Sequence, residues 1–271
     1  MPAEFCLEDL GNGRFGFEID PTLCTGPTED RYLFGGVGVA AAMTAMEKLS
    51  GRSALWTSAQ FLMPAKVGES MELVRTACQE GRAVTQQTIV ASIAGVPVLQ
   101  ATGATSAARP DAAERSWIAA PPAPGPEAAR PTVVHNTAHE DVHSRFDIRP
   151  VKGRFGMFVH DAMSTDGKVL AWLKPLVGGV DRAALAIIAD FLPAVITNAM
   201  GTRTGGRSID NLVRFVRLVP TEWVLAEYHV LGAANGSGHG TATLYAQDGT
   251  LLAFGSQTFR LAKRPRRGGE G

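Results

Sequence analysis

Hydrophobic and polar residues alternate along several segments of the chain, which is the pattern of half-buried β-strands. Four such segments lie in the first half of the sequence, ALWTSAQFLMPA, ESMELVRTACQEG, AVTQQTIVASIAG and VPVLQATGATS. Four follow in the second half, GGRSIDNLVRFVRLVP, EWVLAEYHVLGAANG, GHGTATLYAQDG and TLLAFGSQTFRLA. Ala94-Gly95 and Asp248-Gly249 predict one tight hairpin in each half. Each half also opens with an extended segment, RFGFEI in the first and VHSRFDIRPV in the second.

An apolar segment rich in small residues precedes each set of strands. GGVGVAAAMTAM starts at Gly35, and ALAIIADFLPAVITNAMG starts at Ala184. The first is apolar on nearly all sides, which is typical of a helix enclosed by a curved sheet. One buried helix followed by a meander of antiparallel strands is an α+β unit, so the sequence predicts two such units.

The two halves repeat one another at a shift of 154 residues. This shift places Met46 on Met200 and Gly51 on Gly205, and the order of helix, strand, turn and strand matches. We therefore predict a first unit over residues 1–107 and a second unit over residues 141–262. A linker over residues 108–140 connects them, and residues 263–271 form a basic, glycine-rich tail that we expect to be solvated and disordered.

The linker is recognised by its prolines. Six of them lie between Ala107 and Pro131, and few large apolar residues accompany them. Since proline fixes φ and lacks an N–H donor, this stretch fits neither a core strand nor a long helix. We expect it to run over the surface, with Trp117 and Ile118 as its point of docking.

The composition of the chain argues against nucleic-acid and membrane partners. Lysine plus arginine and aspartate plus glutamate number 26 each, so no basic excess points to a nucleic acid. The apolar stretch from Tyr32 is too short and glycine-rich to span a bilayer, and no secretory signal is visible, so no membrane partner is expected. Three cysteines at no metal-ligand spacing suit a reducing cytoplasm.

Histidine spacing raises the question of a metal site. His135, His139 and His143 lie four residues apart and could line one helix face. They fall, however, where the linker gives way to a strand-like segment, so we interpret them as surface histidines. No metal and no cofactor is expected. GVGVAA at 36–41 lacks the strand and the acidic residue of a dinucleotide site, and no G-x-S-x-G serine elbow is present.

Asp190 is the most informative polar residue. It interrupts an apolar segment just before Pro193, which suits the first turn of a helix because no N–H is needed there. Taken alone, Asp190 is equally well explained as the N-cap of that helix. The shift of 154, however, aligns it with Gly36, so the first half begins its equivalent helix without a carboxylate.

Two more polar residues follow the same asymmetry. The shift sets Ser208 opposite Ala54 and Gln257 opposite Gly103. A carboxylate, a hydroxyl and an amide together can hold one water, with Asp190 as its base and Ser208 and Gln257 as its hydrogen-bond partners. A helix N-terminus beside them would offer N–H groups to an oxyanion. The sequence therefore predicts a hydrolytic site.

At these residues the chain resembles a known family. The motifs are FGG at 34–36, FLMP at 61–64, IRPV at 148–151, ADFLP at 189–193, SIDN at 208–211 and a late strand with Gln257. In this order they resemble the acyl-CoA thioesterase II family of double hotdog proteins, over most of the chain. The departures are Ser208 where the family commonly has Thr, Asn211 where it has His, and Met63 in place of its Arg.

The resemblance implies a function and a set of residues. The fold would be two helix-wrapped antiparallel sheets packed as a pseudo-dimer, and the activity hydrolysis of acyl-CoA to a free acid and CoA, in fatty acid metabolism. It implies catalytic roles for Asp190, Ser208 and Gln257, and substrate binding at the positions Phe34, Gly35, Gly36 and Phe61. Association of double-hotdog chains into a homo-oligomer is left open.

Two alternatives remain at this stage. The same fold hosts hydration or dehydration of acyl thioesters, which uses an Asp and a His on one helical segment. The segment ADFLPAVITNAM has the Asp but no His. A non-catalytic acyl-thioester-binding protein on the same scaffold is the other alternative, and the Asp–Ser–Gln set argues against it.

Overall fold

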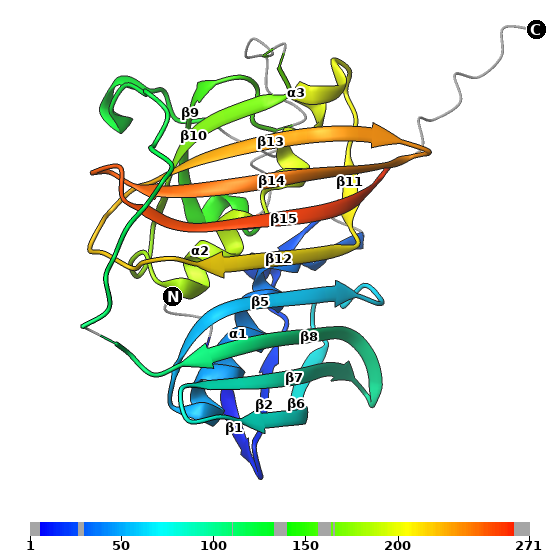
Figure 1. Ribbon diagram of the computed structural model, residues 1–271. Coiled ribbons are helices and arrows are strands. Elements are labelled where there is room, and N and C mark those ends of the chain that lie inside the picture. The colour runs from blue at the N-terminus through cyan, green and yellow to red at the C-terminus, as the bar shows by residue number, and fades with distance from the viewer. Residues whose placement is uncertain are drawn as a thin grey trace, which may run out of the picture.

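One large antiparallel sheet dominates the computed structural model, which describes residues 6–26, 30–109, 111–132, 140–156, 164 and 166–262. Within these residues the sheet has 13 strands, in the order β1-β2-β6-β7-β8-β5-β12-β15-β14-β13-β10-β9, with β11 paired to β15 (Figure 1). β3 and β4 form a separate pair. The predicted tail at 263–271 lies outside the described residues, as do His135 and His139.

The strands of the first half are β1 (Glu8–Gly11), β2 (Arg14–Glu18), β3 (Cys24–Thr25), β4 (Tyr32–Leu33), β5 (Ser53–Phe61), β6 (Ser70–Glu80), β7 (Val84–Ile93) and β8 (Val96–Ser106). Those of the second half are β9 (Phe146–Lys152), β10 (Lys168–Pro175), β11 (Gly206–Ser208), β12 (Asp210–Phe215), β13 (Val224–Ala234), β14 (Ser237–Ala246) and β15 (Leu251–Leu261). The helices are α1 (Gly35–Ser50), α2 (Arg182–Ala189) and α3 (Ile196–Met200), with short 3₁₀ turns η1 (Pro21–Leu23), η3 (Pro126–Ala128), η4 (His143–Arg145) and η5 (Leu192–Val195).

The two halves join edge to edge through β5 and β12. Ser58 lies opposite Leu212 in this pairing, and these two residues are counterparts at the shift of 154. A residue that pairs with its own counterpart lies on the axis relating two repeats, so the junction is a local pseudo-two-fold. The predicted repeat is therefore present in the strand register.

Both predicted opening segments are strands, and the register shows which strands of the two halves correspond. At the shift of 154, β6 falls on β13, and Arg14–Glu18 of β2 falls within β10, not on the segment that opens with VHSRFDIRPV. β10 pairs with β13 as β2 pairs with β6. The counterpart of RFGFEI is thus β10, and β9 lies at one edge of the sheet beside β10 as β1 lies at the other edge beside β2.

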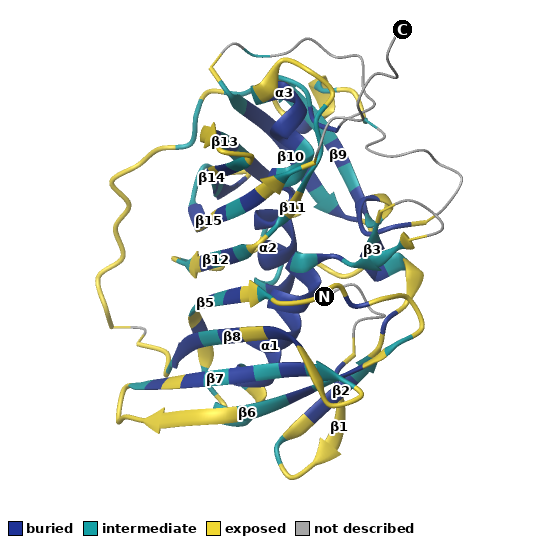
Figure 2. Cartoon of the chain, turned by 90° about the vertical axis from the view of Figure 1, so that its right-hand side faces the viewer, coloured by how far each residue is buried: buried dark blue, intermediate teal, exposed yellow. Residues whose placement is uncertain are grey.

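The helices pack against one face of the sheet (Figure 2). α1 is buried from Gly36 to Met46, as its small apolar residues predict. Among the described residues, the stretch Arg182–Met200, which covers α2, η5 and α3, is long and apolar enough by length and composition to span a membrane. It is 78% buried inside the fold, and it serves here as core of the second half.

The linker crosses the opposite face of the sheet, away from the helices (Figure 2). Trp117 is 89% exposed and Ile118 is 52% exposed, so the predicted docking point is wrong. Docking occurs further along, where Trp172 Nε1 donates to the carbonyl of Pro124 at 2.8 Å. Ala120 and Ala123 pack there on an outer-face cluster of buried residues, Leu170, Trp172, Trp223, Leu225, Tyr245 and Leu251.

Candidate active site

The break in the second helix positions Asp190. α2 ends at Ala189, and Asp190 is its C-cap residue, with φ −85° and ψ 1°. Pro193 ends the regular helix because it has no N–H and its ring clashes with the carbonyl four residues earlier. The chain then continues as η5, with Pro193 in its first turn and without a side-chain cap. The expected N-cap role of Asp190 in its own helix is therefore wrong.

Asp190 instead caps the helix of the other half. Its Oδ2 accepts a hydrogen bond from the backbone N–H of Gly36 at 2.5 Å, in the first turn of α1. The N-cap position of α1, Phe34, makes no side-chain hydrogen bond to the helix. Gly36 and Asp190 are counterparts at the shift of 154, so this contact also lies at the pseudo-two-fold between the halves.

Two carboxamides complete the surroundings of the carboxylate. Asn211 Nδ2 donates to Asp190 Oδ1 at 2.7 Å, and Gln257 Nε2 donates to the same oxygen. Asp190, Asn211 and Gln257 are 0%, 1% and 4% exposed. Three N–H groups from α1, β12 and β15 thus converge on one buried carboxylate, and all of them favour its anionic form.

Burial acts in the opposite direction. Removal of the Asp190 carboxylate from water raises its pKa to about 7, against the lowering effects of the hydrogen bonds from Asn211, Gly36 and Gln257. A pKa raised to near neutrality brings the proton exchange of this carboxyl into the physiological pH range. Such a group is suited to accept and return a proton.

Ser208 joins the site through Gln257. The Nε2 of Gln257 also donates to Ser208 Oγ at 2.9 Å, so one amide group links the hydroxyl and the carboxylate. Ser208 was expected to bind the water, and the structure connects its hydroxyl to Asp190 through Gln257. The other end of the same side chain, Gln257 Oε1, is buried and has no hydrogen-bond partner among the described residues. This orphaned acceptor can accept a hydrogen bond from a water or a substrate.

Gly35 and Gly36 allow α1 to approach Asp190 closely. A Cβ at Gly35 would lie 2.7 Å from Asp190 Oδ2 and 2.7 Å from Phe61 Cζ. A Cβ at Gly36 would lie 2.8 Å from both Asp190 Cβ and Ile187 Cα. The structure therefore brings three of the four residues predicted for substrate binding, Gly35, Gly36 and Phe61, to the carboxylate.

The fourth, Phe34, belongs to an aromatic group behind the carboxylate. Its ring lies 5.2 Å from that of Phe191, the residue after Asp190. His143 stacks on Phe191 at 4.9 Å and lies 3.3 Å from Asp141, Nδ1 to Oδ2. His143 is 7% exposed, so its interpretation as a surface histidine is wrong. No group of three or more metal-ligand side chains is present among the described residues.

Asn211 is the residue that sequence reasoning left without a role. It was noted only as a departure from a family pattern, because its counterpart at the shift of 154 is Thr57, which is also polar. The contrast of polar against small residues that marked Asp190, Ser208 and Gln257 was absent there. Its alternation with Val213, which places both residues on the buried face of β12, is the signal that could have identified it.

Comparison with solved structures confirms the predicted fold class. A candidate thioesterase from Novosphingobium aromaticivorans is 28% identical, with a TM-score of 0.87 over 96% of this chain and 100% of that one. A protein of unknown function with a hot dog fold, from Alicyclobacillus acidocaldarius, is 19% identical, with a TM-score of 0.82 over 97% of each chain. A candidate thioesterase II from Thermobifida fusca is 18% identical, with a TM-score of 0.83 over 96% and 97% of the two chains. The α+β double hotdog is thus the fold of this chain.

Comparison with protein families identifies the enzyme class. No curated protein sequence matches the chain. The family model described as the acyl-CoA thioesterase C-terminal domain matches residues 110–261, which is more than half of the chain. The protein therefore belongs to the acyl-CoA thioesterase family, and it is a thioesterase.

Proposed function

We propose that the protein hydrolyses acyl-CoA to a carboxylic acid and CoA with a water that Asp190 activates, assisted by Gln257 and Ser208. The observation that carries this proposal is the buried Asp190 carboxylate beside the unpartnered Gln257 Oε1. One water between these two groups donates one hydrogen to each of them. Its oxygen lone pair then points away from both and toward a substrate carbonyl.

The steps of the reaction follow from these positions. The water oxygen attacks the thioester carbon while Asp190 accepts the proton of the water, which gives a tetrahedral oxyanion. The N-terminal end of α1 lies beside Asp190, and its positive dipole stabilises negative charge there. The intermediate then collapses with loss of the C–S bond, and protonated Asp190 returns the proton to the departing thiolate sulfur. No bond forms between substrate and protein.

Asn211 and Ser208 act as positioning residues in this scheme. Asn211 fixes one carboxylate oxygen from β12, and Ser208 accepts from the amide group of Gln257 and so sets which end of that side chain faces Asp190. Among the described residues, the groups that bond the Asp190 carboxylate are one backbone N–H and two carboxamides, with no histidine. This set favours hydrolysis over hydration, which needs a second proton-transfer group.

The substitution Asp190→Asn tests the proposal. We expect kcat for acyl-CoA hydrolysis to fall by about 10²–10⁴, the usual contribution of a positioned base, while acyl-CoA still binds. Steady-state kinetics with detection of free CoA measures the first effect, and equilibrium binding measures the second. Ser208→Ala and Gln257→Ala should each cost less, and their losses should not add, because Ser208 acts through the Gln257 side chain. A fully active Asp190→Asn variant would overturn the proposal.

A further inference from the structure

A pair of exposed cations lies next to the site and shares a single carboxylate. The side chains of Arg207 and Lys66 are each 64% exposed. Both approach Asp30, Lys66 Nζ at 3.5 Å from Oδ1 and Arg207 at 3.9 Å from Oδ2. The carboxylate of Glu69 also lies nearby and accepts from the backbone N–H of Lys66 at 2.6 Å, so the two cations share Asp30 as their ion-pair partner and remain largely exposed.

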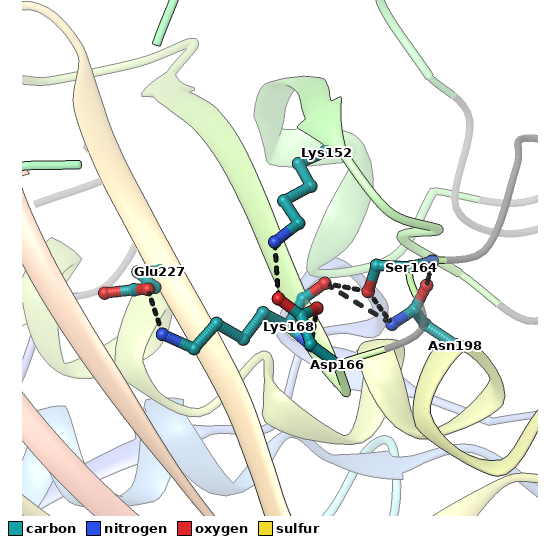
Figure 3. Close-up of polar contacts among 6 residues, drawn as sticks. All are labelled: Lys152, Ser164, Asp166, Lys168, Asn198 and Glu227. Atoms are coloured by element: carbon teal, nitrogen blue, oxygen red, sulfur yellow. Dashed lines mark hydrogen bonds and ion pairs between the residues drawn. The ribbon is translucent and has the colours of Figure 1, made fainter. Parts of the chain in front are cut away.

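The lysines in Figure 3 are paired differently. Lys152 lies 2.6 Å from Asp166, and Lys168 lies 3.0 Å from Glu227, so each has a carboxylate of its own. These pairs are locally neutral, and they lie on β9 and β10, at the outer edge of the sheet. Arg207 and Lys66 differ from these two lysines in sharing a single ion-pair partner, Asp30.

Tyr32 connects the cation pair to the buried site. The guanidinium of Arg207 lies 5.2 Å from the centre of the Tyr32 ring, and Tyr32 forms a backbone bridge with Lys66. Tyr32 is half-buried, and burial raises the pKa of its hydroxyl, with the charge of Asp190 as a further contribution in the same direction. Arg207 also directly precedes Ser208 on β11. The cations thus lie beside Tyr32 and Ser208, at the surface next to the site.

Exposed apolar residues lie beside the same surface. Leu62 is 52% exposed, Met63 is 54% exposed and Ile209 is 43% exposed. They follow Phe61 and Ser208 in the chain, and the N–H of Phe61 donates to the carbonyl of Ile209. A surface with apolar side chains next to two cations fits a ligand that has an uncharged arm followed by phosphate groups.

We propose that Arg207 and Lys66 bind the phosphate groups of the CoA portion of the substrate, with Asp30 as the anion that these groups displace. This inference rests on the proposed function, since it places the thioester at Asp190. Guanidinium and ammonium groups are the side chains that recognise phosphate, and CoA carries a pyrophosphate and a 3′-phosphate. Met63 stands where the resembled family has an arginine, so the FLMP segment has no cation for a phosphate group. In this protein the cations are Arg207 on β11 and Lys66.

The test compares two substrates with the same acyl group, acyl-CoA and acyl-pantetheine, which has no phosphate. In the double variant Arg207→Gln with Lys66→Gln, we expect KM for acyl-CoA to rise about tenfold at low salt, with kcat little changed. KM for acyl-pantetheine should stay the same. Asp30→Asn should have the opposite effect and lower KM for acyl-CoA, because it removes the competing anion. Lys152→Gln is the matched control and should leave KM unchanged for both substrates.

Three results would overturn the inference. They are an unchanged KM for acyl-CoA in the double variant, an equal rise for both substrates, and a higher KM for acyl-CoA in Asp30→Asn. The first two exclude a phosphate contact, and the third excludes competition by Asp30. Both cations are exposed, so these substitutions leave folding nearly unchanged. Failure of the proposed mechanism is distinguishable, since it would appear as full activity in Asp190→Asn whatever the KM values are.

Discussion

The Asp190 carboxylate is held by groups from both halves of the chain. Gly36 donates to it from α1, whereas Asn211 and Gln257 donate from the second half. The carboxylate is therefore positioned only when the two halves are joined, and its distance from α1 depends on the lack of a side chain at Gly36.

The substitution Gly36→Ala tests that dependence. The new Cβ would lie 2.8 Å from Asp190 Cβ and from Ile187 Cα, which are atoms of the crossing helix and cannot move independently of it. We expect kcat to fall by roughly 10²-fold, the cost of a misplaced catalytic group. The control is Gly38→Ala on the same helix, whose Cβ would meet only the end of the flexible Leu99 side chain at 2.8 Å. Equal kinetics in the two variants would contradict this role of Gly36.

Several site residues were predictable because each broke a pattern. Asp190, Ser208 and Gln257 are polar where the first half has Gly or Ala, and this contrast is visible in the sequence alone. The contacts they make were less predictable. Pro193 indicates that a helix is interrupted, but whether Asp190 caps its own helix or α1 depends on how the two helices cross. The burial of His143 likewise depends on Phe34 and Phe191, which are distant in sequence.

At the scale of elements, the linker is attached to the sheet by carbonyl groups. Pro124 accepts from Trp172 Nε1 at 2.8 Å, and Pro126 accepts from Arg149 at 3.0 Å. The prolines identify the linker in the sequence, but the predicted docking point, Trp117 and Ile118, is exposed. Proline carbonyls are strong acceptors, and the indole N–H that binds one of them is on β10, a strand that the sequence pattern did not reveal.

Removal of one linker contact should loosen the linker without affecting the site. Trp172→Phe keeps most of the packing but loses the hydrogen bond to Pro124, so we expect a loss of about 1 kcal/mol in unfolding free energy. Limited proteolysis should then cut the segment 111–132 faster. Trp117→Phe, at an 89% exposed position, is the control and should leave both measurements unchanged. If the linker resisted proteolysis equally in Trp172→Phe and Trp117→Phe, the hydrogen bond from Trp172 to Pro124 would not be what holds it on the sheet.

At the scale of the whole molecule, the pseudo-two-fold explains why the halves differ. Gly36 and Asp190 are counterparts, and they touch. A carboxylate at both positions would place two like charges in contact inside the protein, which is costly. The sequence revealed the repeat, but only the β5–β12 register showed that the axis passes beside Asp190. One carboxylate at the axis implies one site for each chain.

The cost of burying Asp190 should appear in the pH dependence of stability. The pKa of Asp190 is about 7 in the folded state, whereas its ordinary value is 3.8. Between pH 3.8 and 7 the folded state therefore holds a proton that the unfolded state has released. Unfolding free energy should therefore fall as pH rises from about 4 to 7, by up to roughly 1.4 kcal/mol per unit, and level off above 7. Urea denaturation of the wild type and Asp190→Asn at pH 5–8 isolates this contribution. Parallel pH profiles for the two proteins would contradict it.

The central claim is that Asp190 activates a water and does not itself attack the thioester. A single turnover in H₂¹⁸O, with enzyme in excess over acyl-CoA, tests it most directly. Direct attack by water places one ¹⁸O in every carboxylic acid product, leaves Asp190 unlabelled and gives no acyl-enzyme on rapid acid quench, which also excludes an anhydride cleaved at its acyl carbon. Mass spectrometry of the product and of the peptide that contains Asp190 measures both. An unlabelled first product, together with ¹⁸O in Asp190 after further turnovers, would show a covalent anhydride and contradict this account.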